Sequence, residues 1–96
     1  MFARLVTFSL EPGNRPTTER LANEQDPIIR RLPGFESLAW LNDEATSRYG
    51  SFSVWRTRKD AEAVSGVAAL QIKDALKGSM KGRPSVTIYE IYTPQA

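Results

Sequence analysis

The sequence of 96 residues contains no cysteine and no histidine. The lack of cysteine excludes disulfides, thiolate nucleophiles and sulfur ligands for a metal. The lack of histidine excludes an imidazole base, an imidazole metal ligand and the ordinary proximal haem ligand. A metal would need an all-oxygen site, and the adjacent acids Asp43 and Glu44 fall in a predicted turn, where carboxylates are usually solvated. We therefore expect no metal and no haem bound through the ordinary ligand.

Long apolar runs and a strong excess of one charge are also missing. No apolar stretch approaches the roughly 18 residues that a membrane span needs, and residues 1–4 are too short and too strand-like a start for a signal peptide. The formal net charge of +2 is too small to indicate nucleic-acid binding. We expect a cytoplasmic protein without membrane association, folded as a single domain over residues 1–96.

Apolar periodicity predicts four strands and two helical regions. The predicted strands are residues 1–10, 35–41, 49–55 and 85–93, and the predicted helices are residues 16–32 and 58–77. Pro27 would normally break the first helix, but Asp26-Pro27 is also a good start for a new one, so we expect a kinked helix or two short ones. The order β-α-β-β-α-β favours an α+β, ferredoxin-like fold, with a four-stranded antiparallel sheet and two helical regions on one face.

Each predicted helix carries an apolar stripe at helical spacing, which we expect to pack on the sheet. In the first helix the stripe consists of Leu21, Ile28 and Leu32, helped by Ala22, Gln25 and Ile29. In the second helix it consists of Ala61, Val64, Ala68, Ile72, Ala75 and Leu76, widened by Val67 and Leu70. Gly78 follows as the residue that ends this helix.

The first and last predicted strands are apolar on both faces. In the last strand, Tyr89 and Ile91 lie on one side, and Val86, Ile88 and Tyr92 lie on the other. Two helices cover only one face of a sheet, and an apolar second face needs a partner. We therefore expect a homodimer in which two sheets pack face to face.

Residues 48–64 are the most informative stretch, because a strand becomes a helix there within three residues. Thr57 followed by Asp60 is the capping signal for that helix. Four residues of the strand share one face: Tyr49, Ser51, Ser53 and Trp55. Two serines between two large aromatic side chains leave space, and their hydroxyls can hold a polar ligand or water.

Two interpretations of this face stay open. It forms a pocket wall that binds substrate, or its serines simply lie beneath helix side chains. Phe52 and Val54 point to the opposite face of the sheet. Trp40, on the second predicted strand, is interpreted as a core or dimer-contact residue.

RNA-recognition domains share this element order and expose aromatic side chains on their third and first strands. Their third-strand motif requires a basic residue, a glycine, an aromatic residue, a small residue and a second aromatic residue. Here Tyr49-Gly50 is followed by Ser51, and Phe52 comes one place late, which puts its ring on the opposite face. The first strand has no compensating aromatic pair, so we expect no nucleic-acid partner.

Three segments carry a resemblance to a known family: Pro33-Gly34-Phe35, Val54-Trp55-Arg56 and Lys59-Asp60-Ala61-Glu62-Ala63. With the element order, they make the chain resemble the dimeric α/β-barrel superfamily, and within it the antibiotic-biosynthesis monooxygenase-like branch and its small uncharacterised relatives. The resemblance implies a homodimeric α/β barrel of ferredoxin-like subunits, with a mostly apolar pocket between each sheet and its helices. Some members oxygenate polycyclic phenols without metal or cofactor; others degrade haem, isomerise lactones or have no known activity.

The resemblance carries over to few residues. Trp55 matches the tryptophan that often closes the third strand and lines the pocket. The haem-degrading branch has a histidine in the second helix and an asparagine on the first strand. Residues 60–77 contain no histidine and residues 1–10 no asparagine, so haem degradation is disfavoured. Ser51 stands where oxygenating members can carry an amide, which is a departure from their pattern.

The resemblance thus implies a cofactor-independent, monooxygenase-like protein that acts on, or binds, a small aromatic or apolar molecule. The candidate anchors for such a ligand are the Trp55 N–H, the Ser51 and Ser53 hydroxyls, Tyr49, and Arg4 or Arg56 if either reaches inward. A base would be Glu90, a tyrosinate or the acidity of the substrate itself, and no catalytic residue is assigned. The alternative is a non-catalytic dimeric protein that binds a ligand or serves in a stress response.

Overall fold

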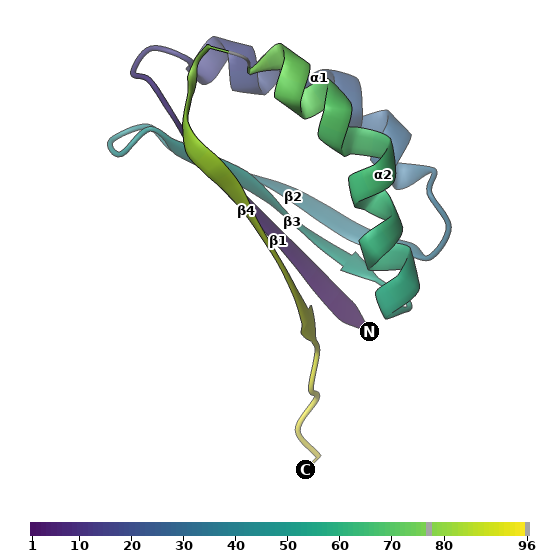
Figure 1. The fold of residues 1–96 in the computed structure, drawn as a ribbon. Helices are drawn as coiled ribbons and strands as arrows, with labels where there is room; N and C mark the ends of the chain where they lie inside the picture. The colour runs from purple at the N-terminus through teal and green to yellow at the C-terminus, as the bar shows by residue number, and fades with distance from the viewer. Residues whose placement is uncertain (77, 96) are drawn as a thin grey trace.

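The computed structural model describes residues 1–76 and 78–95 of the chain, without the side chains of residues 67–75. The elements follow the order β1 (Phe2–Leu10), α1 (Arg15–Arg30), β2 (Phe35–Asp43), β3 (Arg48–Trp55), α2 (Arg58–Ala75) and β4 (Met80–Glu90). The strands form one antiparallel sheet in the order β2-β3-β1-β4. Both helices lie on the same face of that sheet (Figure 1). The predicted ferredoxin-like fold is confirmed.

Helix α1 runs without interruption through Pro27. The expectation of two short helices was therefore wrong. Proline removes one backbone hydrogen bond, here the one that would reach the carbonyl of Asn23. Pro27 and Asn23 are both exposed, so water can bond to that carbonyl. Asp26 starts no new helix and instead accepts hydrogen bonds from the side chains of Arg30 and Trp40.

The buried side of α1 differs from the predicted stripe at several positions, and predicted Leu32 lies beyond the end of the helix. Leu21, Gln25 and Ile29 are buried as expected, and Thr18 joins them. Ile28 is exposed. The helix rotates Ile28 away from the sheet because Ile29, one residue later, occupies the inward position at the spacing of Leu21 and Gln25.

Helix α2 begins with the predicted cap. The Asp60 N–H donates to Thr57 Oγ1 at 3.1 Å, and the Thr57 hydroxyl donates to Asp60 Oδ2 at 2.8 Å. Gly34 also fixes this junction: its carbonyl accepts the Arg56 N–H at 2.8 Å, and its φ is +77°. A Cβ at Gly34 would collide with the Asp60 side chain. Glycine is therefore required where β2 approaches the start of α2.

Part of the predicted second helix lies outside the described residues. Ala61, Val64 and Leu76 are buried as expected. The remaining members of the stripe are Val67, Ala68, Leu70, Ile72 and Ala75, whose side chains are not described, and the predicted end at residue 77 is also outside the described range. Gly78 has φ +85°, as expected for the residue after a helix.

Strand β4 begins five residues before the predicted start and ends three before the predicted end. Its first residues pair with the end of β1, with Met80 opposite Leu10 and Lys81 opposite Ser9, after a register shift. Gly82 and Pro84 suggested a loop. They are tolerated because β4 is an edge strand, where one side of the backbone needs no partner. After β4 the chain runs away from the sheet (Figure 1).

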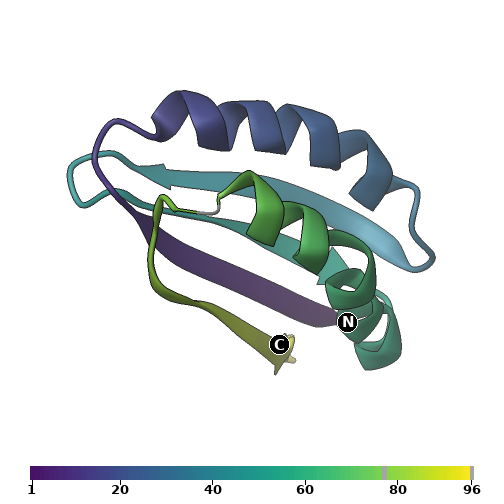
Figure 2. The same ribbon diagram turned by 45° about the horizontal axis from the view of Figure 1, so that its top comes forward.

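Two apolar clusters fill the space between the sheet and the helices, which lie side by side above it (Figure 2). The first cluster consists of Val6, Phe8, Leu10, Leu21, Tyr49 and Leu76. The second has Ile29, Trp55, Ala61 and Val64 at its centre. Between them, the sheet presents smaller and more polar residues to the helices.

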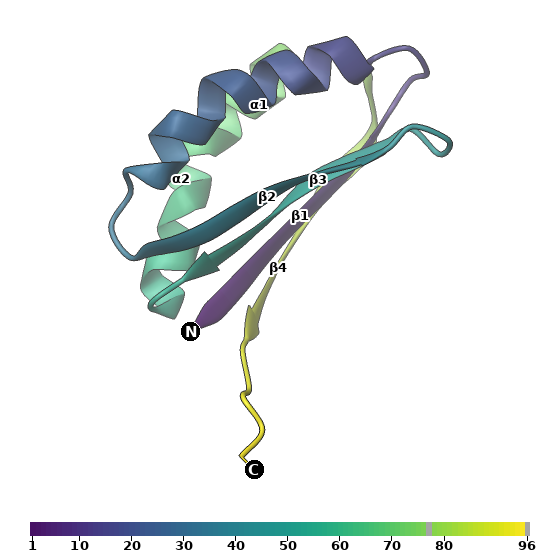
Figure 3. The ribbon, with the colours of Figure 1, turned by 180° about the vertical axis from the view of Figure 1, so that it is seen from behind.

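The opposite face of the sheet carries no helix, as the view from behind shows (Figure 3). Phe52 is 39% exposed and Tyr89 is 53% exposed on this face, and Leu41 is also exposed. Half-buried Leu5 lies directly opposite Phe52 on the same face. No helix in the described part of the chain has the length and hydropathy of a membrane span.

Candidate functional site

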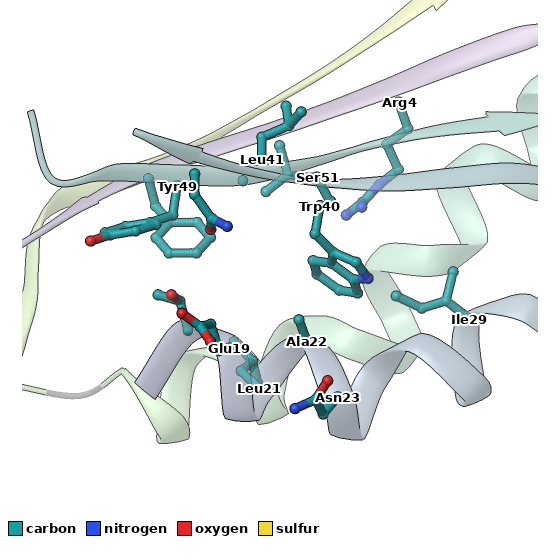
Figure 4. A pocket seen from close by; sticks show the side chains of 15 residues that line it. Arg4, Glu19, Leu21, Ala22, Asn23, Ile29, Trp40, Leu41, Tyr49 and Ser51 are labelled. Atoms are coloured by element: carbon teal, nitrogen blue, oxygen red, sulfur yellow. The ribbon is translucent and has the colours of Figure 1, made fainter. Parts of the chain in front are cut away.

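A cavity of about 260 Å³ lies between the sheet and α1 (Figure 4). Strands β1, β2 and β3 form one wall and α1 forms the other. Val6, Leu21 and Ile29 give the cavity an apolar body. Glu19 and Asn23 line it from exposed positions on α1 and therefore mark its mouth.

The cavity exists because a small residue stands in the middle of a row of large ones. Val6, Ser51 and Trp40 are paired across three neighbouring strands. Ser51 is too short to fill the space between its neighbours and α1. The next row, Arg4 with Ser53, adds a second small residue and a side chain that ends in a polar group. The gap between the two apolar clusters thus follows from the sequence of β1 and β3.

Arg4 lines this cavity with a side chain that is only 6% exposed. Its Nη2 donates to Ser65 Oγ at 3.1 Å. Its Nε is buried without a hydrogen-bond partner. No carboxylate oxygen of a described residue forms an ion pair with the guanidinium. Burial lowers the pKa of Arg4 from its ordinary value, but a guanidinium stays protonated at neutral pH.

Two of the four predicted site residues reach the cavity. Tyr49 and Ser51 line it, and both are buried. The ring of Tyr49 packs against Phe8, with 6.4 Å between the ring centroids. Neither hydroxyl donates to, or accepts from, another described residue, so both hydroxyls are available to a ligand.

The other two predicted site residues lie behind the cavity. The Trp55 Nε1–H donates to Ser53 Oγ at 2.8 Å, and the Ser53 hydroxyl is 3.5 Å from the Arg4 carbonyl oxygen that it faces. Trp55 is 0% exposed and packs edge-on against Phe35 at 5.6 Å between ring centroids. Neither Ser53 nor Trp55 lines the cavity, and Trp55 belongs to the same apolar cluster as Ile29 of the wall.

Trp40 lines the cavity as well, although its sequence position indicated a core or dimer contact. Its Nε1–H donates to Asp26 Oδ1 at 3.0 Å, and the Arg30 Nε–H donates to Asp26 Oδ2 at 2.8 Å. Both bonds hold the pKa of the Asp26 carboxyl below its ordinary value, and the bond from Arg30 has the larger effect. The indole is thereby held in place at the end of the cavity where the Arg4 side chain also extends from the sheet toward α1 (Figure 4).

Of the bases named from the sequence, a tyrosine lines the cavity, namely Tyr49, but Glu90 does not. Glu90 lies at the end of β4, exposed and opposite Phe2. Glu19 lines the mouth, but its carboxylate accepts from Arg15 Nε at 2.9 Å. Arg56 is exposed and pairs with Glu36 at 3.4 Å, so of the two candidate arginines only Arg4 reaches inward.

The family assignment comes from residues 1–70, which match the model of the antibiotic biosynthesis monooxygenase family. The chain belongs to this family. The matched range contains β1, α1, β2, β3 and most of α2, and thus every described residue that lines the cavity. A monooxygenase-like role follows from membership. No functionally curated protein sequence matches the chain.

Several solved structures share the fold of this protein over nearly the whole length of its chain. A candidate antibiotic biosynthesis monooxygenase from Nitrosomonas europaea has 20% identity and a TM-score of 0.81, covering 99% of this chain and 93% of that one. SnoaB, a cofactor-independent oxygenase from Streptomyces nogalater, has 15% identity and a TM-score of 0.73, with 97% and 94% covered. A monooxygenase from the gene ActVA-Orf6 of Streptomyces coelicolor, in complex with nanaomycin D, has 17% identity and a TM-score of 0.71, with 99% and 90% covered.

Only part of this site could be predicted from patterns in the sequence. Alternation along β1 puts Arg4 on the face of Phe2 and Val6, so its inward direction could be predicted. The position of Trp40 opposite Ser51 depends on the register of β2, which the sequence does not reveal because a bulge shifts the pairing between Phe35 and Ser37.

Proposed function

We propose that this protein is a cofactor-independent monooxygenase that acts as a homodimer on a small aromatic or apolar molecule. The observation that carries the proposal is the cavity between the sheet and α1. It combines an apolar body with the unbonded hydroxyls of Tyr49 and Ser51. Pockets of this kind, mostly apolar with a few convergent polar groups, are the usual binding sites for small molecules. A neighbour in fold, SnoaB, is a cofactor-independent oxygenase.

The proposed reaction takes its electrons from the substrate. An electron-rich anthrone or hydroquinone loses a proton to water before it binds, and the resulting anion transfers an electron to dioxygen. For an anthrone, the two radicals combine to a hydroperoxide at the reacting carbon, which loses water to give a carbonyl. The CH₂ group and O₂ thus become C=O and H₂O, and no outside reductant is consumed. The role of the protein is to exclude water, to orient the ring and to stabilise the anion.

Oxygen uptake tests the proposal. We expect the protein to consume dioxygen with an anthrone or a hydroquinone, at a rate above that of the spontaneous oxidation. Ala22 lines the cavity from α1, so Ala22→Phe should fill the cavity and suppress the uptake without removing a polar group. Ala63→Phe, at an exposed position of α2, is the matched control and should leave the rate unchanged. Uptake that does not exceed the spontaneous rate, or that survives Ala22→Phe, would contradict the proposal.

The homodimer is supported by the uncovered face of the sheet. Phe52, Leu41 and Tyr89 are exposed there, on the side away from the helices. A second copy that packs its own sheet against this face would remove these side chains from water. The cytoplasm remains the predicted location.

A second candidate function is the binding of a ligand without chemistry. It is favoured by the shortage of a base: Glu19 is paired with Arg15, and the other proton acceptor in the cavity wall is the Tyr49 hydroxyl. A non-catalytic binding protein, including one that serves in a stress response, would bind the same ligands. It would show a dissociation constant in calorimetry but no oxygen uptake.

A further inference from the structure

Arg4 is the one feature of the cavity wall that a purely apolar ligand does not explain. Its side chain is 6% exposed, and a buried charge is costly unless it is paired. Only one of its three guanidinium nitrogens has a hydrogen-bond acceptor, Ser65 Oγ, among the described residues. A single hydroxyl accepts from one of the five N–H donors of a guanidinium and, unlike a carboxylate, brings no negative charge to balance the buried positive one.

The acids near the cavity are bonded to other cations. The Glu19 carboxylate accepts from Arg15 at 2.9 Å and is exposed at the mouth. Asp26 accepts from Arg30 at 2.8 Å and from Trp40. Tyr49 also lines the wall, and its side chain ends in a phenol rather than a carboxylate. The cavity therefore holds one positive charge that no carboxylate of the described residues neutralises.

We propose that the cavity binds its ligand as a preformed monoanion: a small apolar molecule with one ionised oxygen group, held by the Arg4 guanidinium. The inference rests on the proposed function and narrows its substrate class. The ligand must arrive already ionised, because the wall offers no unpaired carboxylate to remove a proton. The ionised group is a carboxylate or an acidic phenolate, since both present an oxyanion to a guanidinium.

The size of the cavity restricts the apolar part of the ligand. Its volume is about 260 Å³, slightly below the range of roughly 300–1,000 Å³ of pockets for drug-sized ligands. A small fused-ring body fits this space better than a large polycycle. Trp40 and Ile29 supply flat and apolar contacts for such rings, on the same side of the sheet as Arg4 (Figure 4).

A pair of ligands that differ only in charge tests the inference. Calorimetric titration with 2-naphthoate and with neutral 2-naphthamide compares a carboxylate with an amide of the same shape. We expect the wild type to prefer naphthoate by about 10- to 100-fold, as one charged hydrogen bond implies. Arg4→Met should abolish the preference, and Arg4→Lys, which keeps the charge, should keep part of it. Arg20→Met, at an exposed position of α1 outside the cavity, is the matched control and should behave as the wild type.

A further ligand, 4-nitrophenol, distinguishes a site for carboxylates from a site that also binds acidic phenolates. The ionised and neutral forms of 4-nitrophenol absorb at different wavelengths, so the form that binds can be observed directly. Binding of the phenolate that depends on Arg4 would extend the ligand class to acidic phenols. Binding of naphthoate alone would assign the site to carboxylates. Either result supports a monoanion site.

The inference is overturned if the wild type binds naphthamide as tightly as naphthoate, or if Arg4→Met keeps the preference for naphthoate. In the first case the proposed binding of a small apolar molecule survives, and only the preference for an anion fails. If neither compound nor nitrophenol binds, the proposed function and this inference fail together. The wild-type comparison needs no substitution, so the test holds even if Arg4→Met does not fold.

Discussion

Replacing Arg4 by methionine should stabilise the protein, because the substitution removes a buried charge that the fold leaves almost unpaired. The methionine keeps a long apolar stem in the space of the arginine stem, and so it preserves the cavity wall that Arg4 shares with Val6 and Ile29. What disappears is the guanidinium, with its buried and unbonded Nε and its bond to Ser65.

The magnitude follows from these two contributions. A buried donor without a partner costs about 1–3 kcal/mol. The lost Arg4–Ser65 bond contributes in the other direction by about 1.5 kcal/mol, the low end for a bond to a charged group, because Ser65 is only half-buried and its hydroxyl can bond to water instead. We expect a net gain of about 0.5 kcal/mol in the free energy of unfolding. For a domain of this size, that gain raises Tm by about 2–4 °C.

Thermal unfolding measured by circular dichroism, at one fixed protein concentration, is the assay. A double-mutant cycle with Ser65→Ala isolates the contribution of the bond. Ser65→Ala should destabilise the wild type, since it removes the last partner of Arg4, and should have little effect beside Arg4→Met. A Tm that falls by several degrees in a natively folded Arg4→Met would refute the reasoning. Arg4 would then be a structural residue, and its burial would not indicate a ligand.

Three further predictions concern the dimer, the pH dependence and the turn before β2. Phe52→Glu places a charge on the uncovered face of the sheet, so light scattering should show a dimeric wild type and a monomeric variant. A monomeric wild type would contradict the proposed homodimer. The pKa of Asp26 is lower in the folded chain than in the unfolded one. The Asp26 carboxylate therefore stabilises the fold fully when the pH is above the ordinary carboxyl pKa of about 4, and this stabilisation is lost as the pH falls through the lowered pKa of the folded chain. Asp26→Asn should therefore lower Tm at neutral pH, and the difference from the wild type should narrow in acid; a constant difference would count against the bonds from Arg30 and Trp40 as the cause. Gly34 and Gly13 both have positive φ, so replacing either by alanine strains the backbone, at a cost of roughly 1 kcal/mol for Gly13→Ala. Gly34→Ala should cost more in urea unfolding, because a Cβ at Gly34, but not at Gly13, would collide with the Asp60 side chain. Equal costs would show that Asp60 simply moves aside.

The strands show how far local patterns extend. The alternation along β3 correctly separated Tyr49, Ser51, Ser53 and Trp55 from Phe52, because side-chain direction in a strand has a period of two. The same pattern could not tell which of the four would line a cavity. That depends on α1, which closes over Ser51 and leaves Trp55 beneath Ile29.

The ends of the elements show where local patterns fail. The capping residues Thr57 and Asp60 fixed the start of α2 because their hydrogen bonds are local. The start of β4 at Met80 could not be predicted, because residues such as Gly82 and Pro84 discourage a strand and only pairing with Ser9 and Leu10 overrides them. In the same way, Pro27 discourages a helix locally, but α1 continues through it.

The sequence by itself determined the chemistry that is absent, the order of the elements and the face on which each strand residue lies. Composition excludes thiol and imidazole chemistry outright, and periodicity is a local property of the backbone. Only the tertiary structure decided that Arg4 is buried almost without partners beside a cavity, and that Trp40 faces it. Burial and pairing depend on residues distant in the chain, and here they depend on how α1 and Ser65 of α2 close over the sheet.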